Sequence, residues 1–405
     1  MDFTFTAEQR MMASAFRELL DEICSPRRLR MAAEGSGHQA DSDHASGDRT
    51  EGNLADGAQA GGDRADDVDL TVGDQAVGHE TVGAGIGVDD YEAHWRKFAG
   101  MGLLGVLAPE DHGGMGLTDV DFVLLAEEAG RAALPDPLVE HAGVAVPMLA
   151  ELVGHPRVAQ VLGSVARGPT RVSVQHRVNP FVLDAARSNY LLLALGDEIH
   201  LVESARTQLV RESSIDPLRE LFKVESQLNE STRIATGQIA EQVSRRALAR
   251  GALYCAAQLV GLGARMIELA TAYARERRQF GKQIGSYQAI KHQLATAQVK
   301  LELARPVLYA AATRVGSLDT RAQAAISHAK MAATDAADLA ARTALQVHGA
   351  MGYSWEVDLH FFMKRTWALA GAWGDRGFHM RRLSSLVLEG ALQLGPGHTF
   401  EELPT

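Results

Sequence analysis

The sequence has few cysteines and no long apolar run. Its two cysteines, Cys24 and Cys255, are too few for a disulfide framework, and neither lies in a CxxC or Cys/His spacing typical of a metal site. We therefore expect no metal centre and assign both to packing. No run of about eighteen uninterrupted apolar residues occurs, and the opening DFTFTAEQRMM lacks the architecture of a signal peptide. We expect no membrane span and a cytoplasmic protein.

An excess of positive charge is also lacking. The formal net charge is −11, but residues 34–90 hold fourteen Asp or Glu against two Arg, so the rest of the chain is close to neutral. We expect no nucleic-acid partner. The same segment has twelve Gly and no Phe, Trp or Tyr, and it cannot bury enough apolar surface to offset its ordering entropy. It is predicted to be a disordered acidic insertion, either tolerated at the surface or acting as a functional arm.

The whole chain of 405 residues is 46% apolar, enough for a large core. Its apolar periodicity predicts a mainly α protein with a small middle β domain. We expect an N-terminal helical domain over 1–165, a shortened antiparallel β domain over 166–230, a C-terminal four-helix bundle over 231–395 and a tail over 396–405. Helices are predicted at 6–24 with Thr6 as N-cap, around Trp95 and Phe98, from Thr118 or Asp119, and at 139–161, 236–275, 286–315, 320–346, 357–369 and 377–394. Short strands are predicted at 171–176, 189–195, 198–203 and 207–212. Pro306 should kink or split its helix.

One basic stretch predicts an anion site. Residues 275–293 read RERRQFGKQIGSYQAIKHQ, in which a helix end, a Phe-Gly turn and a new helix near Ser286 follow one another. Arg275, Arg277, Arg278 and Lys282 converge on this turn with the free N–H groups of the second helix. Arginine and helix N-termini both favour phosphate, so the stretch is either a phosphate or pyrophosphate cradle or an ordinary solvated helix end.

A second stretch favours the cradle. In QVHGAMGY, Gln346 ends a long Ala-rich helix, and Gly349 and Gly352 allow a sharp turn and close approach to a ligand. A glycine C-cap alone is common, but its pairing with the basic stretch is far more specific.

These stretches resemble the acyl-CoA dehydrogenase family of flavoproteins. The resemblance rests on R-x-x-FG-x-x-IG-x-x-Q from Arg277, on Q-x-x-G-x-x-GY from Gln346, and on WRKFAGMGLLGVLAPEDHGGMGL near the N-terminus. It implies a helical domain, a β domain and a four-helix bundle, assembled as a tetramer or a dimer of dimers. It also implies an FAD lodged largely in a neighbouring subunit. The implied FAD-binding residues are Arg277, Gln279, Phe280, Gln288, Gln346, Val347, His348, Gly349 and Ala350, the last five through their backbone against the adenine half.

The resemblance also implies a reaction, the α,β-dehydrogenation of an acyl-CoA thioester. A carboxylate removes the α-proton while hydride passes to the flavin, and donors to the thioester carbonyl stabilise the developing charge. An electron-transfer flavoprotein is the implied electron acceptor.

The sequence departs from the family at the catalytic base. Members of the family carry the base at one of two positions. Counting forward from Gln346 puts the first at Trp373, and counting back from Phe280 puts the second at Gly251. No catalytic residue is therefore assigned. Asp375 is the nearest acid and is either a displaced base or the N-cap of the helix from 377. The family's usual flavin-ring and acyl-pocket motifs are also not recognisable between residues 170 and 224.

Both departures match one arrangement within the family. Certain actinobacterial members, many associated with steroid degradation, are α2β2 heterotetramers in which one subunit carries the base and the other retains the diphosphate-binding helices. By this resemblance the chain completes the FAD site of a base-bearing paralogue. The alternatives are a self-sufficient homomer that uses Asp375 and a catalytically inactive scaffolding or regulatory paralogue.

Overall fold

The computed structural model describes residues 4–37, 88–392 and 395, and most of these are helical. The N-terminal region begins with α1 (Ala7–Ile23), which a capping box between Thr6 and Gln9 starts as predicted. It continues with α2 (Pro26–Gly37), α3 (Val88–Gly100) and the 3-10 turns η1 (Leu103–Gly105) and η2 (Glu110–His112). A second capping box, between Thr118 and Asp121, starts α4 (Asp119–Arg131).

The predicted acidic insertion falls mostly outside the described residues. Helix α2 extends into its first residues and α3 contains its last ones, so 34–37 and 88–90 are helical. Residues 38–87 and the whole 396–405 tail lie outside the described part of the chain.

The segment predicted as helix over 139–161 has several pieces. It runs through α5 (Leu138–Glu140), a π-helical turn η3 (His141–Ala145), α6 (Val146–Glu151) and α7 (Pro156–Arg167). Gly143 in this turn lets α8 come close, because a Cβ there would lie 2.6 Å from the Tyr254 ring. Sequence periodicity does not reveal such a turn.

The middle of the chain forms two small sheets. One has the order β1-β3-β4-β7 and the other β2-β6-β5. Their bounds are β1 Val172–His176, β2 Val182–Leu183, β3 Tyr190–Leu195, β4 Glu198–Glu203, β5 Gln208–Glu212, β6 Leu221–Glu225 and β7 Arg233–Thr236. The expectation of purely antiparallel pairing is wrong at one place, because β1 pairs with β3 in parallel, Val172 opposite Tyr190. The connection between them passes through β2 and the 3-10 turn η4 (Ala185–Arg187).

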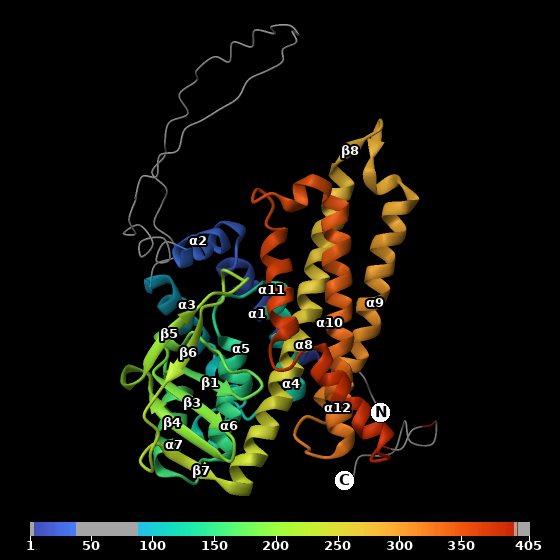
Figure 1. Cartoon of the computed structure of the whole chain (residues 1–405). Helices are drawn as coiled ribbons and strands as arrows, with labels where there is room; N and C mark the ends of the chain where they lie inside the picture. The colour runs from blue at the N-terminus through green and yellow to red at the C-terminus, as the bar shows by residue number, and fades with distance from the viewer. Residues whose placement is uncertain (1–3, 38–87, 393–394, 396–405) are drawn as a thin grey trace, which may run out of the picture.

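The C-terminal helices stand beside this β region (Figure 1). They are α8 (Gly237–Glu276), α9 (Gln288–Ala312), α10 (Thr320–His348), α11 (Leu359–Gly371) and α12 (Arg376–Leu388). Pro306 lies inside α9 without splitting it. Helix α8 is central and packs against α4, α9, α10 and α11. By length and composition it is apolar enough to cross a membrane, yet 89% of its most apolar window is buried, as expected for the core helix of a bundle.

A buried ion pair ties the β region to the bundle. Arg365 on α11 bonds to Asp216 in the loop before β6, and both side chains are almost fully excluded from solvent. A second guanidinium nitrogen of Arg365 donates to the carbonyl of Leu134 at 2.7 Å. Because a buried charge is costly unless paired, this contact fixes where α11 lies.

Candidate functional site

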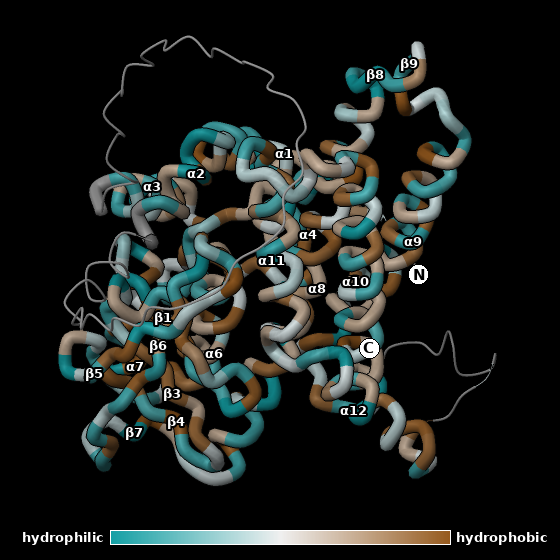
Figure 2. Tube along the Cα trace, turned by 45° about the horizontal axis from the view of Figure 1, so that its top comes forward, coloured by the Kyte–Doolittle hydropathy of each residue, from teal (hydrophilic) through white to brown (hydrophobic). Residues whose placement is uncertain are grey.

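The basic stretch forms a hairpin that projects from one end of the bundle. Strands β8 (Arg278–Gln279) and β9 (Lys282–Gln283) extend beyond α8 and α9 (Figures 1 and 2). The turn residues Phe280 and Gly281 have φ of +51° and +80°, as a type I′ hairpin requires. Phe280 is 91% exposed. A bulky residue with positive φ is strained. The hairpin turn therefore keeps the Phe280 ring exposed to solvent at a cost in backbone conformation.

The cations of the hairpin have no carboxylate partners among the described residues. Arg277 is the C-cap of α8, and neither it nor Arg275 forms an ion pair there. Arg278 donates only to the carbonyl of Gly281, at 3.4 Å, and the Lys282 ammonium lies 4.2 Å from the centre of the Tyr287 ring. These charges are available to an anion.

The second helix of the motif begins beside the hairpin. It starts at Gln288, two residues later than predicted, after the 3-10 turn η6 (Ile284–Ser286). Its N-cap, Tyr287, makes no side-chain capping bond. The first N–H groups of α9 therefore carry the partial positive charge of a helix start without a capping side chain.

The structure brings the second predicted stretch to the same end of the bundle. The His348 ring at the end of α10 stacks on Tyr273 of α8, with centroids 4.4 Å apart and an interplanar angle of 23°. Tyr273 lies one turn before Arg277. The side chains of Val347 and His348 are buried, whereas Gln346, Gly349 and Ala350 are exposed. Only the backbone of the two buried residues can therefore face a ligand.

This end of the bundle fits the diphosphate side of a dinucleotide. It combines unpaired guanidinium groups, an uncapped helix N-terminus and an exposed aromatic ring, which suit phosphate, anion and base stacking respectively. Gly349, with φ of +60°, has no atom within 4 Å of where a Cβ would lie, so the backbone is open to close approach. We call residues 277–288 together with 346–350 the cradle.

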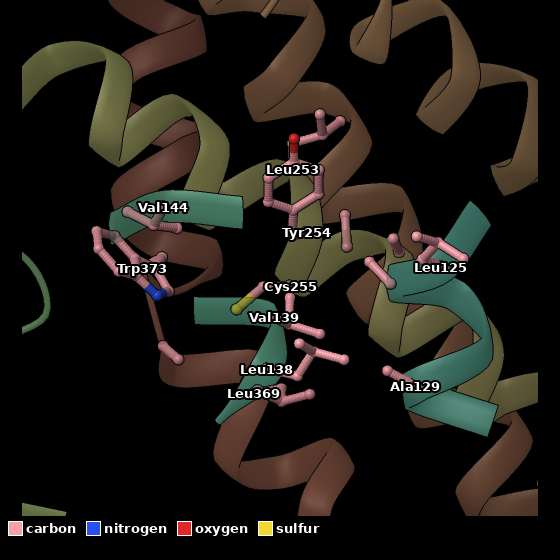
Figure 3. Close-up of a cluster of buried hydrophobic side chains, with 14 of the residues drawn as sticks. Leu125, Ala129, Leu138, Val139, Val144, Leu253, Tyr254, Cys255, Leu369 and Trp373 are labelled. Atoms are coloured by element: carbon pink, nitrogen blue, oxygen red, sulfur yellow. The ribbon is translucent and has the colours of Figure 1, made fainter. Parts of the chain in front are cut away.

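The two positions expected for a catalytic base meet in space and hold no carboxylate. Gly251 lies in the middle of α8, and Trp373 lies in the turn between α11 and α12. A Cβ on Gly251 would lie only 2.1 Å from Cδ2 of the Trp373 indole. Trp373 is 1% exposed and belongs to the buried apolar cluster formed by helices α4, α5, α8 and α11 (Figure 3). An indole therefore fills the place that the resemblance assigns to the base.

Asp375 acts as a helix N-cap, the second of the two roles that the sequence suggests. It is the N-cap of α12, and its Oδ1 accepts the backbone N–H of Phe378 at 2.6 Å. Its carboxylate thus satisfies a helix start.

Two buried groups that the sequence reading missed surround Trp373. Both are fully buried: Lys330 on α10 donates to backbone carbonyls at the end of α11, and His379 on α12 bonds to the Trp373 carbonyl. A lysine in the Ala-rich run of α10 and a histidine two residues before an Arg-Arg pair read as solvent-facing residues. Only the fold places them inside.

Comparisons with known proteins agree with this architecture. Residues 85–168 match the acyl-CoA dehydrogenase N-terminal domain, and residues 242–385 match the acyl-CoA dehydrogenase C-terminal domain. The chain is similar to acyl-CoA dehydrogenase IpdE2 of Mycobacterium tuberculosis, 31% identical over 308 residues that cover 74% of this chain and 87% of the relative.

A longer relative and a solved structure complete the comparison. Acyl-CoA dehydrogenase FadE34 of Mycobacterium tuberculosis is 31% identical over 73% of this chain, and the match spans only 43% of that relative's length. The crystal structure of the ChsE4-ChsE5 complex from the same organism is similar with a TM-score of 0.69 at 19% identity, covering 96% of this chain and 99% of that one. At this identity the likeness shows the fold.

Proposed function

The chain belongs to the acyl-CoA dehydrogenase family, whose members are FAD-dependent oxidoreductases, and from this premise we propose that it completes the FAD site of a base-bearing partner subunit. One observation carries the proposal. The cradle is exposed and its arginines are unpaired, while the position of the base is filled by Trp373. A chain that keeps the cofactor contacts but lacks a carboxylate at the reacting atoms fits the α2β2 arrangement.

Each part of the cradle has a stated task in this proposal. FAD supplies the redox chemistry when bound. Arg277 binds its diphosphate, assisted by the first N–H groups of α9, and the backbone from Gln346 to Ala350 lies against the adenine half. Phe280 stacks at the rim. All of these groups lie on the outer end of the bundle, so they serve a cofactor that a second chain holds from the other side.

The partner supplies what this chain lacks. It carries the carboxylate that removes the α-proton of the acyl-CoA thioester, and the donors that polarise the thioester carbonyl. An electron-transfer flavoprotein accepts the electrons. Resemblance to the heteromeric subgroup extends the proposal to a steroid-derived acyl group and a cytoplasmic location.

The proposal is tested by preparing the chain in two ways. The chain is purified alone and after co-expression with a base-bearing paralogue, and the flavin absorbance and its bleaching by acyl-CoA are recorded for both. We expect a colourless chain alone and a yellow complex that bleaches with substrate.

Two outcomes oppose the proposal, each in its own way. A yellow homomer that bleaches with acyl-CoA supports a self-sufficient dehydrogenase. A chain that assembles with the paralogue without any change in its flavin content or turnover supports a scaffolding role.

A further inference from the structure

A buried lysine holds the end of α11, just before the turn that carries Trp373. Lys330 is 1% exposed, and its Nζ donates to the carbonyls of Leu369 at 2.8 Å and Ala370 at 3.1 Å. No carboxylate forms an ion pair with it in the described part of the chain. Its partners are the carbonyls at the end of α11, which carry the negative end of the helix dipole. Burial of an ammonium is costly, and here these two carbonyls offset part of that cost.

A neutral histidine and an asparagine hold the next residues. His379 is fully buried, with Nε2 3.1 Å from the Trp373 carbonyl and Nδ1 3.3 Å from the Ser327 hydroxyl. Burial lowers the pKa of His379 to about 4, so near neutral pH one ring nitrogen donates and the other accepts. The carbonyl of Trp373 then accepts from Nε2–H, and Nδ1 accepts from Ser327. On the other side, the Trp373 N–H lies 3.4 Å from Oδ1 of Asn179.

The backbone of this turn is strained in a way that directs the indole inward. Trp373 has φ of +55° and Gly374 has φ of +95°. A side chain as large as tryptophan occupies the left-handed region only where its surroundings enforce it. Here the enforced conformation lays the indole against Gly251, the single position along this part of α8 where a missing side chain leaves room for it. On the side of the β region the His176 ring lies next to the indole, with ring centroids 5.7 Å apart.

We propose that Trp373 closes this subunit's own acyl chamber, and that Lys330 and His379 are positioning residues that keep it closed. The inference rests on the proposed function and deepens it. The indole excludes the acyl chain of an acyl-CoA thioester from this subunit, so that each pair of unlike chains binds one thioester, in the partner. Loss of the base alone would leave a second, unproductive acyl site that competes for substrate.

The test counts bound acyl-CoA on the intact complex of this chain with its partner. Isothermal titration with octanoyl-CoA, under anaerobic conditions with the flavin already reduced, gives the number of equivalents per pair. The wild-type complex is expected to bind one, and Trp373→Ala to bind a second. Trp373→Phe keeps a ring in place and is expected to bind one. The matched control is Trp367→Ala, because Trp367 lies on α11 and is 41% exposed.

The positioning role has its own readout. His379→Leu removes the donor to the Trp373 carbonyl and is expected to admit a second equivalent, whereas His379→Gln retains an amide N–H and is expected to bind one. A purely structural role for His379 would lower the melting temperature of both variants without changing the count.

The outcomes separate this inference from the proposed function. If Trp373→Ala still binds one equivalent while the wild-type complex is yellow and active, the closing role of Trp373 is wrong and the shared FAD site stands. Should Trp373→Ala fail to fold, the His379 pair gives the same count, and a single equivalent in His379→Leu overturns the inference. A wild-type chain that binds flavin and bleaches alone overturns the proposed function itself.

Discussion

Replacing Gly251 by alanine should destabilise the protein, although alanine is the better helix former. The added methyl carbon would lie 2.1, 2.4 and 2.6 Å from Cδ2, Cε3 and Cε2 of Trp373. Carbon atoms in contact prefer about 3.5–4 Å, so one group must move by more than ~1 Å. The indole cannot retreat easily, because it is buried and its backbone is bonded on both sides.

The magnitude follows from two opposing terms. Overpacking a well-filled core costs about 1–3 kcal/mol, whereas alanine in place of glycine inside a helix contributes about 0.5–1 kcal/mol in the other direction. The net expectation is a loss of about 1–2 kcal/mol. For a large domain this lowers the melting temperature by roughly 2–8 °C.

The assay is a mutant cycle read by thermal melting. Wild type, Gly251→Ala, Trp373→Ala and the double variant are compared in the full complex. Without the indole the clash disappears, so Gly251→Ala should raise the melting temperature of the Trp373→Ala protein. Gly371→Ala in α11 is the control, because no atom lies within 4 Å of its Cβ position and no loss is expected. Equal shifts from Gly251→Ala in both backgrounds would refute the contact.

Three further predictions concern single residues. Asp375→Ala should cost about 1 kcal/mol through the lost N-cap and leave turnover of the complex unchanged; loss of turnover in a stably folded variant would instead make Asp375 the base. Phe280→Ser should leave the melting temperature unchanged, since the ring is exposed, but should increase FAD dissociation measured by dialysis; unchanged retention would remove Phe280 from the cradle. Burial lowers the pKa of Lys330 from 10.5 to about 8, so between these values the folded chain binds fewer protons than the unfolded chain. The free energy of unfolding should therefore rise with pH from about 8 to 10.5, by up to ~1.4 kcal/mol per pH unit. In denaturant titrations Lys330→Met should lack that rise. Identical pH profiles for the two proteins would contradict the lowered pKa of Lys330.

Local signals explain which helices the sequence predicts well. The Thr6 and Asp375 caps and the long apolar periods of α8 and α10 all depend on neighbouring residues, and each is confirmed. The parallel pairing of β1 with β3 depends instead on which distant strands meet, which alternation of apolar residues does not encode. The two-residue strand β2 is too short to show any period.

In the candidate site, too, the part made of neighbouring residues can be predicted from the sequence and the part made of distant residues cannot. The hairpin with Phe280 and Gly281 at its turn is a contiguous motif, so the turn can be predicted from the sequence, while phosphate binding by it stays a prediction. The contact between Gly251 and Trp373 joins helix α8 to a turn that lies far away in the chain. Sequence counting shows that neither position holds a carboxylate. Only the fold shows that the two residues touch and that the indole occupies the space where a side chain at Gly251 would lie.

The proposed function requires that the cradle of this chain contacts an FAD bound by the partner subunit. The most direct measurement is the FAD content per complex after Arg277→Ala, from the absorbance of flavin released from purified material. Arg245→Ala is the matched control, since Arg245 lies near the opposite end of α8 and pairs with Glu241. We expect Arg277→Ala to lose most of its FAD while the control keeps it. Full FAD content in Arg277→Ala would contradict the account.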